Sequence, residues 1–111
     1  MKRTREQIAK TESLFRNVNE EIKDATERFD SETGEFICEC GDPRCTEHIR
    51  LPIETYDKVR HHPARFVVRP GHVKGAIERI VRRERTHSVI EKVDSIAARI
   101  ARRLNPRTET T

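Results

Sequence analysis

"FICECGDPRCTEH" (residues 36–48) contains all three cysteines of this 111-residue chain and one of its five histidines. Cys38, Cys40, Cys45 and His48 give the spacing C-x-C-x4-C-x2-H. Side chains two positions apart on a strand point the same way, so Cys38 and Cys40 can offer two sulfurs to one ion. The turn formers at 41–44 fold Cys45 back, and His48 follows. Three thiolates and one imidazole can close a tetrahedron around Zn²⁺, so the segment predicts a structural zinc site.

The metal prediction leaves three alternatives open. The thiols could be independent buried side chains, because free cysteine packs like a small apolar residue, although charged neighbours surround them here. Asp42 or the more distant His72 could replace His48 as the fourth ligand. A [2Fe–2S] cluster is the rival for the metal, but such clusters more often take four thiolates. Zinc is the cofactor that the pattern favours.

The same cluster argues against an enzyme. A catalytic zinc keeps one coordination position open for water and works with a nearby glutamate, whereas four ligands within eleven residues fill the coordination sphere. The chain has no H-x-E with P-C-x-x-C, no glycine-rich phosphate loop and no evident small-molecule site. We therefore expect a protein without catalytic residues.

Three stretches carry a resemblance to a known group of proteins: "FICECGDPRCTEHIRL" (36–51), "YDKVRHHPARFVVRPGH" (56–72) and "VIEK" (89–92). Over about residues 30–93 the chain resembles a family of short, largely uncharacterised actinobacterial proteins with a long N-terminal helix. The resemblance is strongest at the three cysteines and His48. It implies a zinc-finger-like metal site and a small α+β domain, and it carries no established activity. Residues 94–111 lie outside it.

The composition describes a small and very polar chain. Charged residues make up 38% of it, there is no tryptophan, and only one methionine is present. A chain of 111 residues forms one domain at most, and with so little apolar surface it benefits from an additional brace. No apolar run reaches the length of a signal peptide or of a membrane span. Clustered thiols in such a chain favour metal binding in the reducing cytoplasm, where we expect the protein to reside.

The N-terminal segment shows one clear helical period. Ile8, Phe15, Ile22 and Phe29 are seven residues apart, with Thr11, Val18 and Ala25 between them, and no glycine or proline occurs in residues 1–33. This heptad stripe predicts a long helix. The stripe could pack on the domain's own sheet or pair between two copies of the chain. We expect a homodimer built partly from residues 6–30.

The remaining sequence predicts short strands and helices. Glycine and turn formers at 30–36 end the first helix, and strands follow at 36–38, 47–53 and 64–72, with a short helix at 53–63 capped by Thr55. Residues 76–92 fit either a helix or a hairpin, and we favour the hairpin. An amphipathic helix begins near Val93 with Asp94 or Ser95 as its cap. The expected fold is α+β in three segments: the heptad helix (1–33), a zinc-braced antiparallel core (34–92), and an arginine-rich C-terminal helix and tail (93–111).

The positive charge is concentrated in the C-terminal third. Residues 76–111 carry nine basic and five acidic side chains, and the whole chain has a net charge of +4. Arginine suits phosphate recognition, and a pI near 9.3 is compatible with nucleic acid as a partner. We expect Arg99, Arg102, Arg103 and Arg107 to form the contact surface for DNA or RNA. Alternatively, these arginines pair with the acidic cluster of the N-terminal helix: Glu20, Glu21, Asp24 and Glu27.

Three functions are compatible with these patterns. The favoured one is a zinc-stabilised, regulatory binding module that contacts nucleic acid or a nucleoprotein partner. The second is a protein–protein adaptor that dimerises through its N-terminal helix. The third is a thiol redox or metal sensor whose thiolates release zinc on oxidation.

Overall fold

The computed structural model describes residues 4–107. It begins with the predicted long helix, α1 (Arg5–Arg28). Thr4 and Gln7 form a capping box at its start, in which the Thr4 hydroxyl accepts from the Gln7 amide and the Gln7 side chain accepts from the Thr4 amide. Each contact satisfies a backbone donor that the first turn leaves unpaired. The predicted long N-terminal helix is therefore confirmed, over Arg5–Arg28.

The strands form two antiparallel sheets. β1 (Thr33–Ile37) pairs with β2 (His48–Pro52) in the first sheet, and Phe36 lies opposite Ile49. The second sheet has the order β3-β5-β4, from β3 (Arg65–Val68), β4 (Glu78–Arg83) and β5 (Ser88–Lys92). β4 and β5 are the two arms of the hairpin favoured for residues 76–92.

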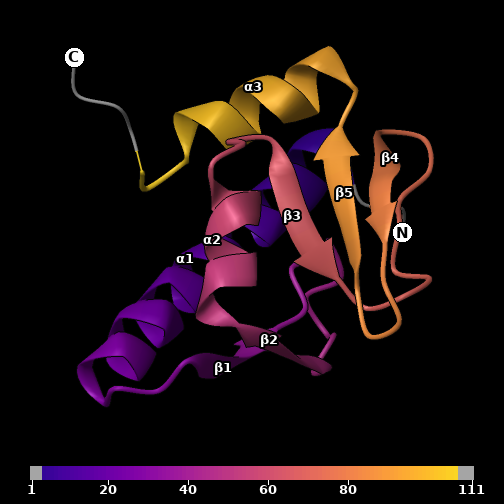
Figure 1. Cartoon of the computed structure of the whole chain (residues 1–111). Helices are drawn as coiled ribbons and strands as arrows, with labels where there is room; N and C mark the ends of the chain where they lie inside the picture. The colour runs from indigo at the N-terminus through magenta and orange to yellow at the C-terminus, as the bar shows by residue number, and fades with distance from the viewer. Residues whose placement is uncertain (1–3, 108–111) are drawn as a thin grey trace.

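Two shorter helices complete the α+β fold. α2 (Ile53–Arg60) follows β2 without a break, and α3 (Ser95–Arg103) follows β5. The carboxylate of Asp94 accepts from the amides of Ile96 and Ala97, as predicted for the cap of α3. The prediction that Thr55 caps α2 is wrong, because the helix starts at Ile53, directly after Pro52. β1 and β2 lie at the end of the molecule opposite α3, and α1 runs between these two ends (Figure 1).

The main core lies between the two sheets and α2. Phe36 and Tyr56 stack with ring centroids 4.3 Å apart, and Phe66 from β3 is fully buried with them in one cluster. Cys38 and Cys40 belong to this cluster, with 1% and 2% of their surface exposed. The cysteine segment is thus part of the core.

The buried face of α1 is mostly polar and differs from the predicted stripe. Its fully buried residues include a glutamate, an arginine and an asparagine, and the complete set is Ala9, Glu12, Ser13, Arg16 and Asn19. Of the heptad residues, Ile8 and Ile22 pack partly against the core. Phe29 is 84% exposed. The stripe therefore supplies the edges of the buried face and leaves apolar surface on the outside.

Backbone groups of distant elements bind two of the buried polar side chains of α1, Arg16 and Asn19. Arg16 donates to the carbonyl of Ala101 at 2.7 Å, near the end of α3, and to the carbonyl of Pro63 at 2.8 Å. Its guanidinium lies 4.7 Å from the centre of the Phe66 ring, a cation–π contact. Asn19 donates to the Ile37 carbonyl and accepts from the Ile37 amide, so its side chain caps the end of β1. These bonds make a polar helix face compatible with burial.

Candidate metal centre

Cys38 and Cys40 lie where the chain leaves β1. The Cys38 amide donates to the Glu47 carbonyl, and the Glu39 amide donates to the Val67 carbonyl at 2.8 Å. Between the two cysteines, the Glu39 carboxylate is buried and accepts from Asn19, from the Tyr56 hydroxyl at 2.7 Å and from the Val67 amide. This anchor fixes the backbone on both sides of the thiols. Burial raises the pKa of Glu39, and these hydrogen bonds oppose the rise.

The loop after Cys40 turns back and packs against α1. We call residues 38–47, which contain no helix or strand, the cysteine loop. Its Asp42 accepts from the amide of Arg44 with its side chain, and from the amide of Cys45 with its carbonyl at 3.1 Å. At Gly41 a Cβ atom would lie 2.3 Å from Cγ2 of Ile8. The turn places Cys45 beside the other thiols, and only glycine leaves room for α1.

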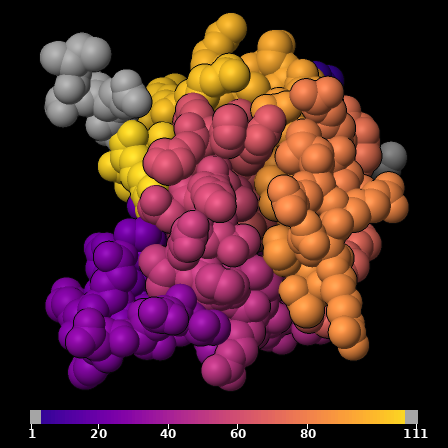
Figure 2. All heavy atoms as spheres, viewed as in Figure 1, coloured from indigo at the N-terminus to yellow at the C-terminus, as the bar shows by residue number. Residues whose placement is uncertain are grey.

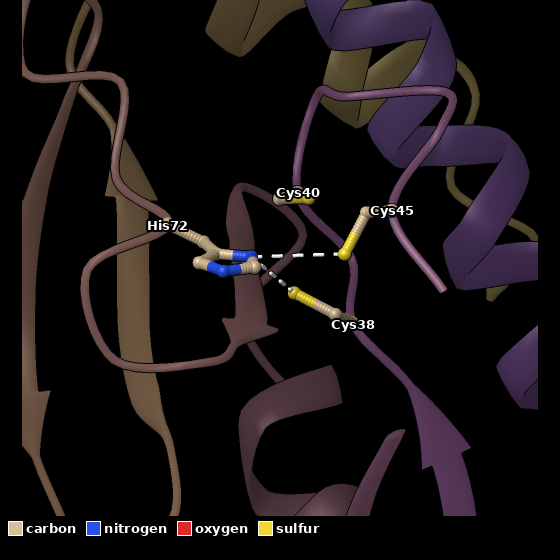
Figure 3. Close-up of side chains that lie close together, drawn as sticks. All are labelled: Cys38, Cys40, Cys45 and His72. Atoms are coloured by element: carbon tan, nitrogen blue, oxygen red, sulfur yellow. Dashed lines mark hydrogen bonds between the residues drawn. The ribbon is translucent and has the colours of Figure 1, made fainter. Parts of the chain in front are cut away.

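His72 reaches the cysteines from the second sheet. It follows β3 in a turn of four residues, Arg69-Pro70-Gly71-His72, in which the His72 amide donates to the Arg69 carbonyl at 3.0 Å. Proline at the second position and Gly71 at the third, with φ +88°, are the features of a type II turn. Figure 3 shows the His72 imidazole facing the sulfurs of Cys38 and Cys45, with Cys40 beside them.

The four candidate ligand atoms lie close together. The Sγ atoms of the three cysteines and a ring nitrogen of His72 all lie within 4.8 Å of one another. Nδ1 of His72 is 3.5 Å from Sγ of Cys38 and 3.7 Å from Sγ of Cys45. Zinc bond lengths at tetrahedral angles give sulfur–nitrogen separations of about 3.6 Å. The four side chains are therefore close enough to hold one metal ion.

Each thiol has a backbone amide directed at its sulfur. The amide of Arg69 donates to Cys38 at 3.2 Å. The amide of Asp42 donates to Cys40 and that of Glu47 to Cys45, and both bonds lower the pKa of the thiol that accepts them. Such bonds favour the thiolate, which is the form that binds metal.

The pKa values of the three thiols depend on one another. The hydrogen bond between Cys38 and Cys40 lowers the pKa of Cys40 to about 5 and raises that of Cys38, which burial raises further. Burial is also the main cause that raises the pKa of Cys45. One thiolate is thus favoured over its two neighbours, and a bound cation would have to displace the remaining protons.

The structure corrects the prediction for His48. This residue is the first of β2 and lies opposite Ile37 in the ladder, where alternation turns Ile49 into the core and leaves His48 exposed. Its Nδ1 is 3.8 Å from a carboxylate oxygen of Glu35, and its side chain is 59% exposed. The structure brings His72 to the three cysteines instead. The sequence feature that could have pointed to His72 as a ligand was the Pro70-Gly71 pair, because a tight turn directly before a histidine gives its side chain a fixed direction.

The four predicted nucleic-acid-binding arginines fall into two groups. Arg99, Arg102 and Arg103 are exposed on α3 and make no ion pair with the part of the chain that the structure describes. Arg107 is half-buried and paired, because it donates to Glu20 of α1 at 2.6 Å and to Asp57 of α2 at 2.7 Å. These contacts raise its pKa and lower that of Asp57. Pairing with the acids of α1 therefore holds for Arg107.

Within residues 4–107, no helix combines the length and apolar character needed to cross a membrane. Comparison of the chain with models of protein families, with curated proteins and with solved structures found no match.

Proposed function

We propose that this chain is a small, non-catalytic binding module whose fold is stabilised by one zinc ion on Cys38, Cys40, Cys45 and His72. The observation that carries the proposal is the convergence of four ligand atoms within 4.8 Å from two separate segments. Three thiolates and an imidazole are the donors that zinc prefers in structural sites. With all four positions filled by protein, the ion has no open position for a substrate.

The spacing also favours zinc over an iron–sulfur cluster. A [2Fe–2S] cluster distributes its terminal ligands over two irons, which places the ligand pairs on opposite sides of the cluster. Here the imidazole nitrogen is within 3.7 Å of two of the sulfurs. That arrangement suits four bonds to one ion.

Elemental analysis and metal removal test this proposal. Freshly purified protein should contain one zinc per chain. Treatment with a chelator should lower the unfolding temperature, because binding free energy at such a site is folding free energy. Added zinc should restore it, and magnesium should not, since magnesium prefers oxygen ligands. Protein that contains no metal and whose stability does not respond to chelator would contradict the proposal.

We propose nucleic acid as the partner, in a regulatory role, with Arg99, Arg102 and Arg103 as the contact surface. All three are exposed on one helix. Arg107 is not part of this surface, because its guanidinium is already paired with the carboxylates of Glu20 and Asp57. A surface that neutralises phosphates gives an affinity that falls steeply with salt.

A triple variant tests this surface. Replacing Arg99, Arg102 and Arg103 by glutamine should lower the slope of log affinity against log salt by about one per arginine. The control replaces Lys10, Arg28 and Arg44, which are exposed elsewhere, so the net charge changes equally. An equal loss in both variants would mean that net charge alone drives binding, and retention of neither DNA nor RNA by the wild type would exclude this partner.

A second candidate function is an adaptor that dimerises through α1. Apolar surface remains uncovered on this helix and at its C-terminal end: Leu14 is 59% exposed and Val18 39%, and Phe29, directly after the helix, is 84% exposed. Such surface is often part of an interface. Val18→Asp should abolish a dimer without disturbing the core, whereas the partly buried Ile22 is a poor site for this test. A wild type that is monomeric by light scattering at high concentration would exclude this candidate.

A further inference from the structure

We propose that the cleft between α2 and the β4–β5 hairpin binds a phosphate-bearing ligand of nucleotide size. The cleft has a volume of about 460 Å³. One wall is formed by residues 50–59 of β2 and α2, and the other by residues 82–89 of the hairpin. In Figure 2 these two parts of the chain, pink and orange, face each other on the side toward the viewer. The site is separate from the metal centre, because none of the four candidate metal ligands lines it.

The charge of the cleft is strongly positive. Four basic side chains reach it from both walls: Arg50, Lys58, Arg82 and Arg85. A smaller hollow of about 240 Å³ shares Lys58 and Arg82 with it, and also contains Arg65, which is paired with Glu91 at 3.2 Å. Among residues 4–107, Glu84 is the one carboxylate that lines the larger cleft, and no carboxylate lines the smaller hollow. Basic groups that converge on a concave surface concentrate the field there and attract anions.

Arg50, Arg82 and Arg85 are free to turn toward a ligand, and Lys58 makes an exposed pair with Glu54 at 3.6 Å. Arg85 makes no ion pair with residues 4–107. Nη1 of Arg50 lies 3.8 Å from Glu35, and both side chains are mostly exposed. Arg82 donates to Glu84, which is two residues away on the same hairpin, and 72% of the Arg82 side chain is exposed. Exposed pairs of this kind contribute little, so exchange of a carboxylate for a phosphate costs little. The planar fork of arginine then favours phosphate, which it can bind in a bidentate manner.

The floor of the cleft explains the expected size of the ligand. It includes Leu51, Val59 and Val89, whose exposed fractions are 2%, 7% and 5%. Ligand pockets generally combine such an apolar floor with a few polar groups and measure about 300–1,000 Å³. The hydroxyls of Thr55 and Thr86 offer the polar contacts. The basic side chains would bind a phosphate, and the apolar floor would bind a flat, weakly polar group. A nucleotide combines these two groups.

The test is an NMR titration of the zinc-loaded protein with three probes: a nucleoside monophosphate, its nucleoside, and inorganic pyrophosphate. The monophosphate should shift the backbone amides of residues 50–59 and 82–89 in a saturable manner. Pyrophosphate should shift mainly the amides near the arginines, and the nucleoside should bind more weakly than the monophosphate.

A double variant and a matched control give the proposal its sharpest test. Arg82→Gln with Arg85→Gln removes two exposed cations and should weaken monophosphate binding by about tenfold or more. Lys10→Gln with Arg28→Gln removes the same charge outside the cleft and should change the affinity by less than about twofold.

Three outcomes would overturn the proposal. The first is a set of shifts spread over the surface without saturation, and the second is an equal loss of affinity in the control. The third is a response to a single-stranded oligonucleotide but not to the monophosphate, which would assign the cleft to a nucleic-acid strand. Zinc content is measured on the same samples, so failure here is distinguishable from failure of the metal proposal.

Discussion

Nδ1 of His72 lies 3.5 Å from Sγ of Cys38, although 34 positions separate them in the sequence. The two residues lie in two long segments without regular secondary structure. Residues 38–47 and 69–77 contain no helix or strand, so ladders do not hold them together. A metal ion bound between them would link the two segments in the folded state, and its binding free energy would add to the stability of the fold. The metal would thus stabilise the part of the fold in which no strand pairing joins the two segments.

The choice between the two histidines gives the first prediction. His72→Ala should weaken zinc binding by more than about 100-fold, because even residues that only support a ligand are worth about 10–100-fold. His48→Ala should leave the affinity unchanged, since its side chain points into solvent beside Glu35. Competition with a chromophoric chelator measures both. A larger effect of His48→Ala would reverse the ligand assignment.

The sequence could predict the three sulfur ligands but could not decide the fourth ligand. Crowding of Cys38, Cys40 and Cys45 within eight residues is a local pattern, and local patterns survive folding. Whether His48 or His72 joins them depends on the β1–β2 register, which assigns His48 to a ladder, and on the packing of β3 beside the cysteine loop. Both are features of the tertiary structure, which the local sequence does not determine. The prediction of a hairpin at 76–92 succeeded because the apolar pairs Ile80-Val81 and Val89-Ile90 stand on either side of a short polar stretch, which is a local pattern.

Close packing at Gly41 gives the second prediction. Gly41→Ala should destabilise the protein by about 1–3 kcal/mol, the usual cost of overpacking, because the new methyl group would lie 2.3 Å from Cγ2 of Ile8. Ile8→Leu removes that methyl branch and should recover part of the loss. Chemical denaturation of the single and double variants measures the coupling.

Gly75→Ala is the matched control for this prediction. No atom lies within 4 Å of the added Cβ at that position, so its effect should stay within about 0.5 kcal/mol. Equal effects at Gly41 and Gly75 would show that the cysteine loop does not pack tightly on α1.

The polar buried face of α1 could not be predicted from periodicity. A heptad pattern counts apolar residues, whereas this face is buried because Arg16 and Asn19 find backbone partners in α3 and β1. Those partners are 85 and 18 positions away in the sequence. The same applies to Glu12, which contacts Lys92 of β5 with neither side chain exposed. The sequence could therefore predict that α1 is a helix, but it could not predict which face of α1 is buried.

The buried charges around Lys92 give the third prediction, on pH. Lys92 contacts Glu12 and lies 2.5 Å from Glu78, so two carboxylates share one cation. Burial is the main cause that raises the pKa of Glu12 well above 4.5. The folded state then holds a proton that the unfolded state releases. Its stabilising effect is complete below about pH 4.5 and is lost as the pH rises through the folded pKa.

Glu12→Gln should flatten this dependence. The free energy of unfolding of the wild type should decrease from pH 4.5 upward, and the variant should show a smaller decrease over the same range. Some slope should remain, because burial also raises the pKa of Glu39. Glu21→Gln, on the exposed side of the same helix, is the control and should retain the wild-type slope. A Glu12→Gln profile parallel to that of the wild type would refute the role of this carboxyl group.

The anchor of the cysteine loop gives the fourth prediction. The Tyr56 hydroxyl donates to the buried Glu39 carboxylate at 2.7 Å, and Glu39 lies between Cys38 and Cys40. Tyr56→Phe keeps the ring that stacks on Phe36 but removes one donor, so it should cost about 1–3 kcal/mol. The pKa of Glu39 should rise further. Denaturation and a pH titration of stability measure the two effects, and a loss below about 0.5 kcal/mol would mean that the hydroxyl has no structural role.

Zinc-edge X-ray absorption of the purified protein tests the central claim most directly, because it reports both the metal and its ligands. We predict one zinc per chain with a first shell of three sulfur atoms at about 2.3 Å and one nitrogen atom at about 2.0–2.1 Å. His72→Ala should replace or remove the nitrogen contribution from the ring, and His48→Ala should leave the spectrum unchanged. A shell of oxygen and nitrogen alone, or a protein without zinc, would contradict the account.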